Sequence, residues 1–305
     1  MTQAKLILGI GELLWDVLPE GMLLGGAPAN FAVMAARLGN HAAILSRIGR
    51  DELGKKAVEL LEPLPADARF MQVDPAQETG RVTVKFESGQ PAYTIHQPAA
   101  WDFMELTDEW VQLAVRADAI CFGSLAQRSR ESRQTIQTLV ARTPASCARV
   151  FDVNLRAPFF CGEVIRESLE LATVLKMNDA EAPRVLELLG LPIPTSGWLR
   201  VAAKQLLKEF TSLRMVAVTR GAQGSLLLTR EEEHEHPGIP VEVADTIGAG
   251  DAFTAAMIHY LLRGADLATL NEAGNRWGAW MASRSGAMPA LPQAVLAEIA
   301  AGLEG

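Results

Sequence analysis

The sequence predicts an α/β fold in which a mostly parallel central sheet is flanked by helices. Short apolar runs typical of buried strands alternate with longer runs typical of helices along most of the 305 residues. Polar side chains recur directly after several of these strand-like runs, where α/β enzymes keep their sites. An amphipathic hairpin at 80–96 breaks the alternation and predicts a small separate β element.

The N-terminal third follows the alternation closely. A glycine-rich turn at 25–30 opens a helix that ends at Gly39, a typical C-cap position. Buried strands are expected before and after this helix, at 5–10 and 42–48, and a second helix is expected after the turn at 49–54. Such a β-then-α order is typical of parallel sheets covered by helices.

The hairpin is the exception to this order. Val82, Val84 and Phe86 alternate with polar residues, a turn follows at 87–90, and the chain returns at 92–96. The apolar face of this hairpin needs cover, either from the rest of the chain or from the same hairpin of a second copy.

The second half returns to alternating strands and helices. The expected strands are 119–123, 150–154, 174–177, 215–219 and 225–229. The expected helices are 130–142, 164–172, 181–189 and 198–210. A short strand at 239–243 precedes an apolar helix at 252–263, and the remaining C-terminal part is helical apart from 285–292.

Composition excludes several classes of protein. The hydrophobic content of 49% and the charged content of 21% are ordinary for one globular domain of this length. A net charge of −8 argues against a nucleic-acid partner. The three cysteines show no C-x-x-C spacing and the apolar start is interrupted by acidic residues, so we expect a cytoplasmic protein with no membrane partner. The chain lacks the G-x-x-x-x-G-K-[ST] loop and the G-x-S-x-G elbow.

The stretch 245–253, Asp-Thr-Ile-Gly-Ala-Gly-Asp-Ala-Phe, carries the strongest chemical signal. Gly248, Ala249 and Gly250 form a turn at the mouth of a helix, where unpaired N–H groups and the helix dipole favour an anion such as phosphate. Asp251 adds a carboxylate beside that anion site, as phosphoryl transfer to a hydroxyl requires. The alternative is an ordinary helix N-terminus with glycines for a tight turn.

Further polar residues follow predicted strands and are candidates for one shared cleft: Asp16, Asp152, Asn154, Arg156, Asn178 and Thr219. Asn178 and Glu181 lie three apart at a helix start, where they either cap the helix or hold Mg²⁺ through water. Arg156 is suited to a phosphate or carboxylate, or is simply exposed. The turn at 219–224 either admits a nucleotide close to the backbone or only joins two strands.

These motifs together resemble those of the ribokinase-like (PfkB) carbohydrate kinases. The stretch 245–253 is similar to the C-terminal signature of that family. The residues that resemble the N-terminal signature are Gly25, Gly26, Pro28, Asn30 and Ala32, followed by Gly39 and Gly49. The G-x-D-x-x-G step at 49–54, Asn178-x-x-Glu181 and Thr219-x-Gly221 complete the set in order. The resemblance covers essentially the whole chain.

The resemblance implies a single domain over 1–305 with a Rossmann-like central sheet and a small β-sheet lid, whose strands come from about 12–24 and 79–97. It also implies an ATP-dependent sugar kinase that uses Mg²⁺ and a monovalent cation such as K⁺. In this reading Asp251 is the catalytic base, and Gly248, Ala249 and Gly250 form the anion hole.

The resemblance assigns the remaining candidates to three groups. The sugar-binding candidates are Asp16, Gly25, Gly26 and Asn30, to which we add the nearby cations Arg81 and Arg156. The nucleotide candidates are Asn178, Thr219, Gly221, Gly224, Gly248, Gly250 and Asn275. Asn178 and Glu181 are the Mg²⁺ candidates. The monovalent-cation candidates are Asp245, Ile247, Arg284 and Gly286.

Within the family the chain looks most like the fructokinases, so fructose is the expected acceptor and fructose 6-phosphate the expected product. A 2-keto-3-deoxygluconate kinase is the alternative, because it shares the D-x-N-x-R pattern at 152–156. Asp16 favours a neutral sugar, since a carboxylate binds hydroxyls and repels a sugar acid. A sugar-binding regulator without turnover is a more distant alternative, disfavoured because Asp251 and the anion hole are intact. Fructokinase-like relatives often pair two lids, so we also expect a homodimer.

Overall fold

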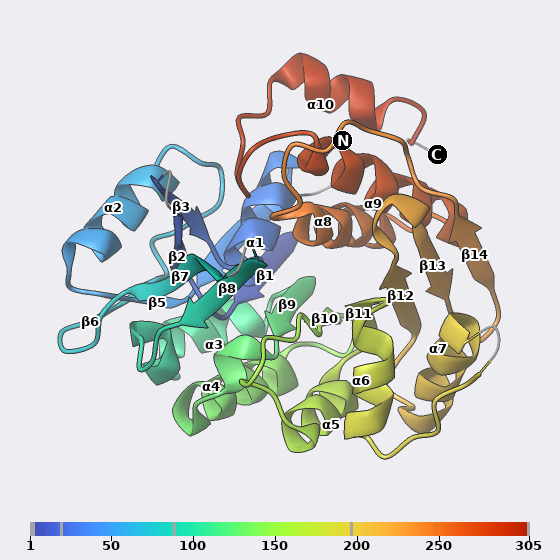
Figure 1. Cartoon of the computed structure of the whole chain (residues 1–305), viewed down its shortest axis with the longest axis horizontal. Coiled ribbons are helices and arrows are strands. Elements are labelled where there is room, and N and C mark those ends of the chain that lie inside the picture. Colours follow the sequence, from blue (N-terminus) through green and yellow to red (C-terminus); the bar gives the residue numbers. More distant parts are fainter. Residues whose placement is uncertain (1–3, 19–20, 88–89, 196–197, 304–305) are drawn as a thin grey trace.

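The computed structural model describes residues 4–18, 21–87, 90–195 and 198–303, and it describes the side chains of these residues except those of 84–87 and 90–93. Its centre is an eight-stranded sheet (Figure 1). In spatial order the strands are β14 (Glu233–His236), β13 (Ser225–Leu228), β12 (Met215–Thr219), β11 (Val174–Asn178), β10 (Ala148–Asp152), β9 (Ala119–Gly123), β1 (Leu6–Ile10) and β4 (His41–Leu45). Neighbours from β4 to β12 are parallel, and β13 and β14 are antiparallel additions. The predicted α/β class is confirmed.

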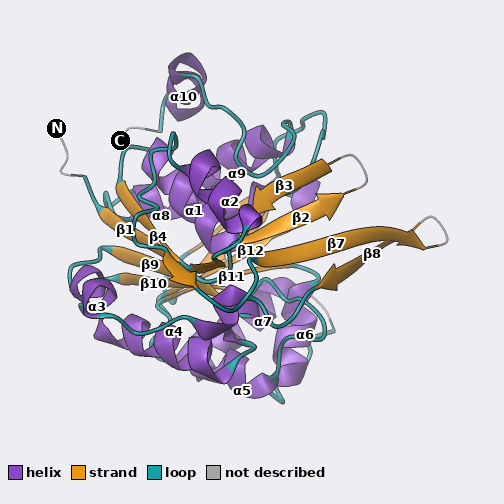
Figure 2. Cartoon of the chain, turned by 90° about the vertical axis from the view of Figure 1, so that its left-hand side faces the viewer, coloured by secondary structure: helices purple, strands orange, loops and turns teal. Residues whose placement is uncertain are grey.

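Helices cover both faces of this sheet (Figures 1 and 2). One face carries α1 (Ala27–Arg37), α8 (Ala249–Leu261) and α9 (Leu267–Ala282), with α10 (Gln293–Ala300) outside them. The other face carries α3 (Asp108–Ala114), α4 (Arg130–Arg142), α5 (Gly162–Leu171), α6 (Glu181–Leu188) and α7 (Trp198–Glu209). Each face has its own cluster of buried apolar residues, so successive residues of a strand contribute to different clusters.

A four-stranded small sheet projects from this body (Figure 2). Its strands, in spatial order, are β3 (Gly21–Gly25), β2 (Leu14–Leu18), β7 (Gly80–Glu87) and β8 (Gln90–Ile95). The predicted hairpin is therefore present as β7 and β8, and β2 pairs with β7 in parallel. The turn at 88–89 lies outside the described residues, as do the side chains of Val84 and Phe86, so the dimer expected through this sheet stays a prediction.

A short two-stranded sheet and α2 (Glu52–Leu61) support the small sheet. Asp51 caps α2 by accepting from the Gly54 N–H at 2.7 Å, and it also accepts from the Thr79 hydroxyl at 2.6 Å and the Thr79 N–H at 2.8 Å. These bonds tie the start of α2 to the residue before β7. The G-x-D-x-x-G step thus anchors the small sheet to the body.

One predicted strand is too long and another is wrong. The run 42–48 is divided between β4 of the central sheet and β5 (Arg47–Gly49), which pairs with β6 (Gln72–Asp74). The run 239–243 is an irregular segment after β14, with Val243 58% exposed. Pro240 lacks the N–H that a strand would donate there, so the apolar residues of this segment do not extend the sheet.

Single turns of 3₁₀ helix occur at Ala100–Phe103, Leu125–Gln127 and Gly221–Gln223. In the described parts of the chain, every helix is too short or too polar to cross a membrane.

Candidate active site

The N-terminus of α8 forms the centre of the site. Gly248 is its N-cap in the left-handed conformation, with φ of 76°, and no side chain caps this helix end. A Cβ on Gly248 would lie 3.1 Å from the Cα of Ala287, so both the conformation and the space require glycine. An uncapped N-terminus keeps backbone N–H groups available for an external anion.

Asp251 lies in the first turn of α8 and is linked to α1. Its Oδ2 accepts from the Asn30 Nδ2 at 2.8 Å, so the structure brings together the predicted base and a predicted sugar-binding residue. Burial raises the pKa of Asp251, while Lys176, the Asn30 hydrogen bond and Arg156 lower it. A carboxylate with a raised pKa is a stronger base, as removal of a hydroxyl proton requires.

The Gly25–Gly26 turn meets Glu12, a residue that sequence reasoning missed. Gly26 is the N-cap of α1 with φ of 122°, and a Cβ there would collide with the Glu12 carbonyl oxygen. Glu12 is 3% exposed, and its Oε2 has no hydrogen-bond partner among the described residues. Burial raises the pKa of Glu12 to about 7; backbone N–H groups and Arg156 oppose this rise, and Asp251 adds to it.

Glu12 should make folding stability depend on pH. Its folded-state pKa of about 7 exceeds its ordinary value of 4.5, so the folded protein holds more protons between these values and loses stability as pH rises through them. Relative to the wild type, Glu12→Gln should therefore gain stability between pH 5 and pH 8, by about 2.5 kcal/mol. Urea unfolding of the ligand-free proteins measures this. Glu59→Gln, at an exposed position, is the control. The expectation is contradicted if the unfolding free energies of Glu12→Gln and the wild type differ by the same amount at pH 5 and at pH 8.

Asp16 and Arg156 extend the site toward the small sheet. A Cβ on Gly25 would lie 3.1 Å from the Asp16 Oδ2, which places this carboxylate beside the glycine turn. Burial raises the pKa of Asp16, Arg156 lowers it and Asp245 raises it. Arg156 is exposed and interacts electrostatically with the Glu12, Asp16 and Asp251 carboxyls.

Arg81 is a predicted sugar-binding residue that the structure does not bring to this site. It pairs with Trp15 across β2 and β7, whereas Asp16, the next residue of β2, pairs with Val82. Because successive residues of a strand face opposite sides, Arg81 lies on the other face of the small sheet from Asp16. Its guanidinium bonds Glu78 at 3.1 Å.

Asn178 and Glu181 form the capping arrangement that their spacing allows. The Asn178 N–H donates to the Glu181 Oε2 at 2.8 Å, and the Glu181 N–H donates to the Asn178 Oδ1 at 2.8 Å. The Leu155 N–H donates to the Glu181 Oε1 at 2.8 Å, which joins this cap to the loop before Arg156. The Mg²⁺ role of the pair stays a prediction.

A buried ion pair lies beside the anion site; its carboxylate, Asp152, was a candidate for the shared cleft, but its cation, Lys176, was missed. Lys176, in β11, contacts both carboxylate oxygens of Asp152 in β10, at 3.0 and 3.1 Å. Burial raises the pKa of Asp152 to about 7, and Lys176 opposes the rise. The signal in the sequence was a single cation inside the otherwise apolar run 174–177.

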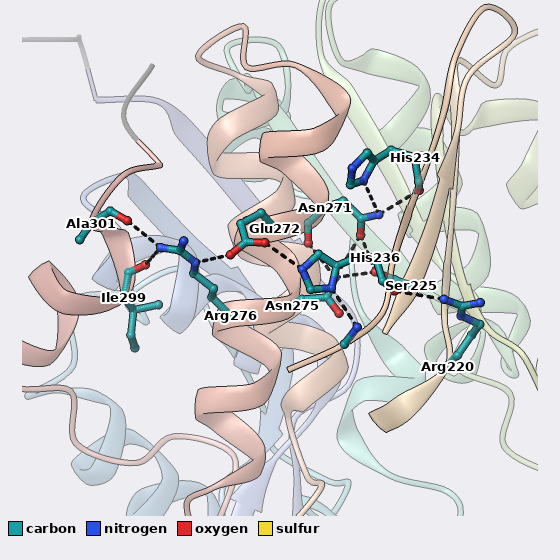
Figure 3. A network of polar contacts seen from close by, with 11 residues as sticks. Arg220, Ser225, His234, His236, Asn271, Glu272, Asn275, Arg276, Ile299 and Ala301 are labelled. Carbon is teal, nitrogen blue, oxygen red and sulfur yellow. Dashed lines mark hydrogen bonds and ion pairs between the residues drawn. The ribbon is translucent and has the colours of Figure 1, made fainter. Parts of the chain in front are cut away.

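Of the predicted nucleotide residues, Thr219 and Gly221 lie at the end of β12, whereas Gly224 and Asn275 are buried in the fold. Thr219 ends β12, and Gly221 follows it in the left-handed conformation with open space around it. Gly224 is buried, and a Cβ there would collide with the His236 carbonyl oxygen, so the fold itself requires this glycine. Asn275 donates to the Ser225 hydroxyl at 2.7 Å inside a polar network (Figure 3). The nucleotide roles of all four stay predictions.

That network joins the last two strands to α9 (Figure 3). The Asn275 Nδ2 also donates to the Asn271 carbonyl at 2.7 Å, and Asn271 donates to the His234 carbonyl at 2.9 Å. His236 contacts Glu272 at 2.8 Å, and Glu272 accepts from Arg276 at 2.6 Å. The network therefore fixes the edge of the sheet that carries the turn at 219–224.

The two loops predicted to hold a monovalent cation are joined by Asp245. Its Oδ1 accepts from the Ile247 N–H at 3.0 Å and its Oδ2 from the Gly286 N–H at 3.2 Å. The Arg284 side chain is exposed, next to this junction. The structure thus brings the four predicted residues together in adjacent loops, and the cation itself stays a prediction.

An uncapped helix N-terminus with a partly buried carboxylate beside it, at the carboxyl edge of a doubly wound sheet, is the arrangement of a phosphotransferase that acts on an alcohol. The sequence profile of the pfkB family carbohydrate kinases matches residues 20–294. The chain belongs to this family and is an ATP-dependent sugar kinase.

Similar proteins include fructokinases and an uncharacterized sugar kinase. The uncharacterized sugar kinase PH1459 of Pyrococcus horikoshii is 31% identical over 301 residues, which cover 92% of this chain and 91% of that protein. The fructokinase of Escherichia coli is 29% identical over 316 residues, covering 93% and 95%. The structure of Vibrio cholerae fructokinase with fructose, ADP and calcium ion matches with a TM-score of 0.80 at 26% identity, covering 97% of this chain and 98% of that one.

Proposed function

We propose that this kinase phosphorylates fructose at a primary hydroxyl and forms fructose 6-phosphate. The observation that carries the proposal is the excess of carboxyl groups on the acceptor side. Glu12, Asp16 and Asp251 surround this region, and Arg156 is the cation that interacts with all three. Such a field favours a neutral sugar over an anionic sugar acid. The fructokinase names among the similar proteins support the same acceptor.

The geometry supports a direct transfer. Asp251 accepts the proton of the sugar hydroxyl while the hydroxyl oxygen bonds to the γ-phosphorus of ATP. The bond between that phosphorus and the bridging oxygen breaks, and ADP leaves with this oxygen. The N-terminus of α8 stabilises the negative charge of the transferring group. Asn30 holds the Asp251 carboxylate through its hydrogen bond and so fixes the direction in which the base points.

The donor set fits Mg²⁺ held through water. Each Glu181 oxygen accepts one backbone N–H, which leaves further lone pairs on a buried carboxylate. Among the described residues no three His, Cys, Asp or Glu side chains form a metal cage, and Mg²⁺ ordinarily keeps several waters. Bound there with Asn178 nearby, Mg²⁺ would neutralise charge on the phosphates of ATP. The loops at 245–247 and 284–286 would hold K⁺.

A coupled ADP-release assay tests the acceptor. Fructose, tagatose, ribose, nucleosides and 2-keto-3-deoxygluconate are compared at equal ATP concentration. We expect the highest kcat/KM for fructose. A higher kcat/KM for 2-keto-3-deoxygluconate would overturn the proposal while leaving the sugar kinase class intact.

Replacing Asp16 by alanine should weaken fructose binding. Hydrogen bonds from hydroxyls to a carboxylate are worth about 1.5–3 kcal/mol, so the fructose KM of Asp16→Ala should rise roughly 10-fold or more. Arg81→Ala is the matched control within the same small sheet, because Arg81 lies on the opposite face, and its KM should stay unchanged. Steady-state kinetics at saturating ATP measure both. Equal KM values for wild type and Asp16→Ala would remove Asp16 from the acceptor site.

A further inference from the structure

The Lys176–Asp152 pair is a buried charge pair that the transfer described above does not use. Lys176 is 7% exposed and Asp152 is 4% exposed, and the two contact at 3.0 Å. Removing two charges from water costs several kcal/mol per ion, and a buried pair is often replaceable by apolar residues without loss of stability. Stability alone is therefore a weak reason for an ammonium group at this position.

The position of Lys176 follows from the strand that carries it. Val174, two residues earlier in β11, packs in the same cluster as the apolar residues of α8, while Leu175 and Met177 pack in the cluster on the opposite face. The alternation of side chains therefore directs Lys176 toward α8. Because Lys176 is near the carboxyl end of its strand, it meets the N-terminus of that helix.

The contact with the anion site is close. A Cβ built on Gly250 would lie 2.8 Å from the Lys176 Nζ, so the ammonium occupies the space beside the second glycine of the Gly-Ala-Gly turn. The charged groups that interact with Lys176 are Asp152 from β10, Glu181 from α6 and Asp251 from α8. The ammonium thus lies beside the predicted anion hole and interacts electrostatically with the predicted base and the capping carboxylate.

We propose that Lys176 is a positioning residue for phosphoryl transfer: held by Asp152, it adds positive charge to the anion site at Gly250 and beside the carboxyl group of Asp251. A cation within a few ångströms strengthens the attraction of the helix N-terminus for the terminal phosphate of ATP. It also favours the carboxylate form of a neighbouring acid. The proposal rests on the sugar kinase activity and not on the identity of the acceptor sugar.

Two variants separate this role from a structural one. Lys176→Gln removes the charge and keeps a donor for Asp152, and the double variant Lys176→Met with Asp152→Asn removes both charges without leaving either one unpaired. Asp152→Asn alone retains the ammonium but removes the carboxylate that holds it, so it measures the effect of positioning. Lys204→Gln is the matched control, because Lys204, on α7, forms an exposed ion pair with Glu233 of β14 at 2.9 Å.

The variants are assayed with whichever sugar the wild type phosphorylates fastest. We expect kcat to fall about 10²-fold in Lys176→Gln and in the double variant. The acid limb of the kcat–pH profile should move up by about 1 unit or more, because Asp251 loses a nearby cation. Calorimetry should show ATP affinity reduced about 10-fold and ADP affinity retained, since ADP lacks the terminal phosphate.

The control Lys204→Gln should match the wild type in every measurement. The proposal is overturned if a folded Lys176→Gln variant keeps the wild-type acid limb and the wild-type ratio of ATP to ADP affinity. It is equally overturned if a folded double variant keeps the wild-type kcat and the wild-type pH profile, because the ammonium would then have no effect on the transfer.

Discussion

Replacing Asp251 by asparagine should lower kcat by at least ~10², because general-base assistance contributes about 10²–10⁴-fold to proton removal from a weakly acidic hydroxyl. Asparagine keeps the size of the side chain and an oxygen that accepts from Asn30, so the site should keep its shape. The sugar KM should therefore change little. Steady-state kinetics over sugar concentration at saturating ATP measure both parameters.

Asp108→Asn is the matched control for this variant. Asp108 also lies in the first turn of a helix, α3, and has the same favourable interaction with the helix dipole. Loss of that interaction alone should leave kcat unchanged. A folded Asp251→Asn protein that retained more than a tenth of the wild-type kcat would remove Asp251 from the role of base.

Gly248→Ala should lower kcat by about 10², the loss typical when one donor of an anion hole is removed. The added methyl group would meet Ala287, with the carbonyl oxygen at 3.2 Å, so the turn must shift and misdirect its N–H groups. The same change also imposes a left-handed conformation on alanine, at a cost of about 1–2 kcal/mol. Kinetics and urea unfolding separate the two effects.

Gly264→Ala provides the control at the other end of the same helix. Gly264 has φ of 79° and no atom within 4 Å of its ideal Cβ, so alanine there carries the conformational cost without a collision. Both variants should lose similar stability, and only Gly248→Ala should lose activity. Equal kcat values for the two would show that the turn at Gly248 does not bind the transferring group.

The central part of the site could be predicted from the sequence because its parts are local. A Gly-Ala-Gly turn followed by Asp251 specifies an uncapped helix N-terminus with a carboxylate beside it, whatever surrounds it. The spacing of Asn178 and Glu181 likewise specifies their reciprocal hydrogen bonds. The alternation of strands and helices specifies the class of fold for the same reason.

The features of the site and the fold that could not be predicted depend on contacts between segments that are distant in the sequence. Glu12 and Lys176 have no local motif, and their chemistry appears only when α1 and α8 close over the sheet. Arg81 could not be placed without the register of β2 and β7, since one residue decides which face a side chain occupies. The apolar run 239–243 has the composition of a strand but lies where the sheet has already ended.

The two edges of the central sheet also bear on whether a strand of another chain can add to it. At one edge β14 carries Glu233 and Glu235, each in an ion pair with Arg200. At the other edge the backbone of β4 exchanges hydrogen bonds with Asp67, at 2.7 and 3.0 Å. Charge and a covering loop both discourage the addition of a foreign strand. Strand addition at the central sheet is thereby disfavoured, and the dimer expected through the small sheet, whose outer strands are β3 and β8, stays a prediction.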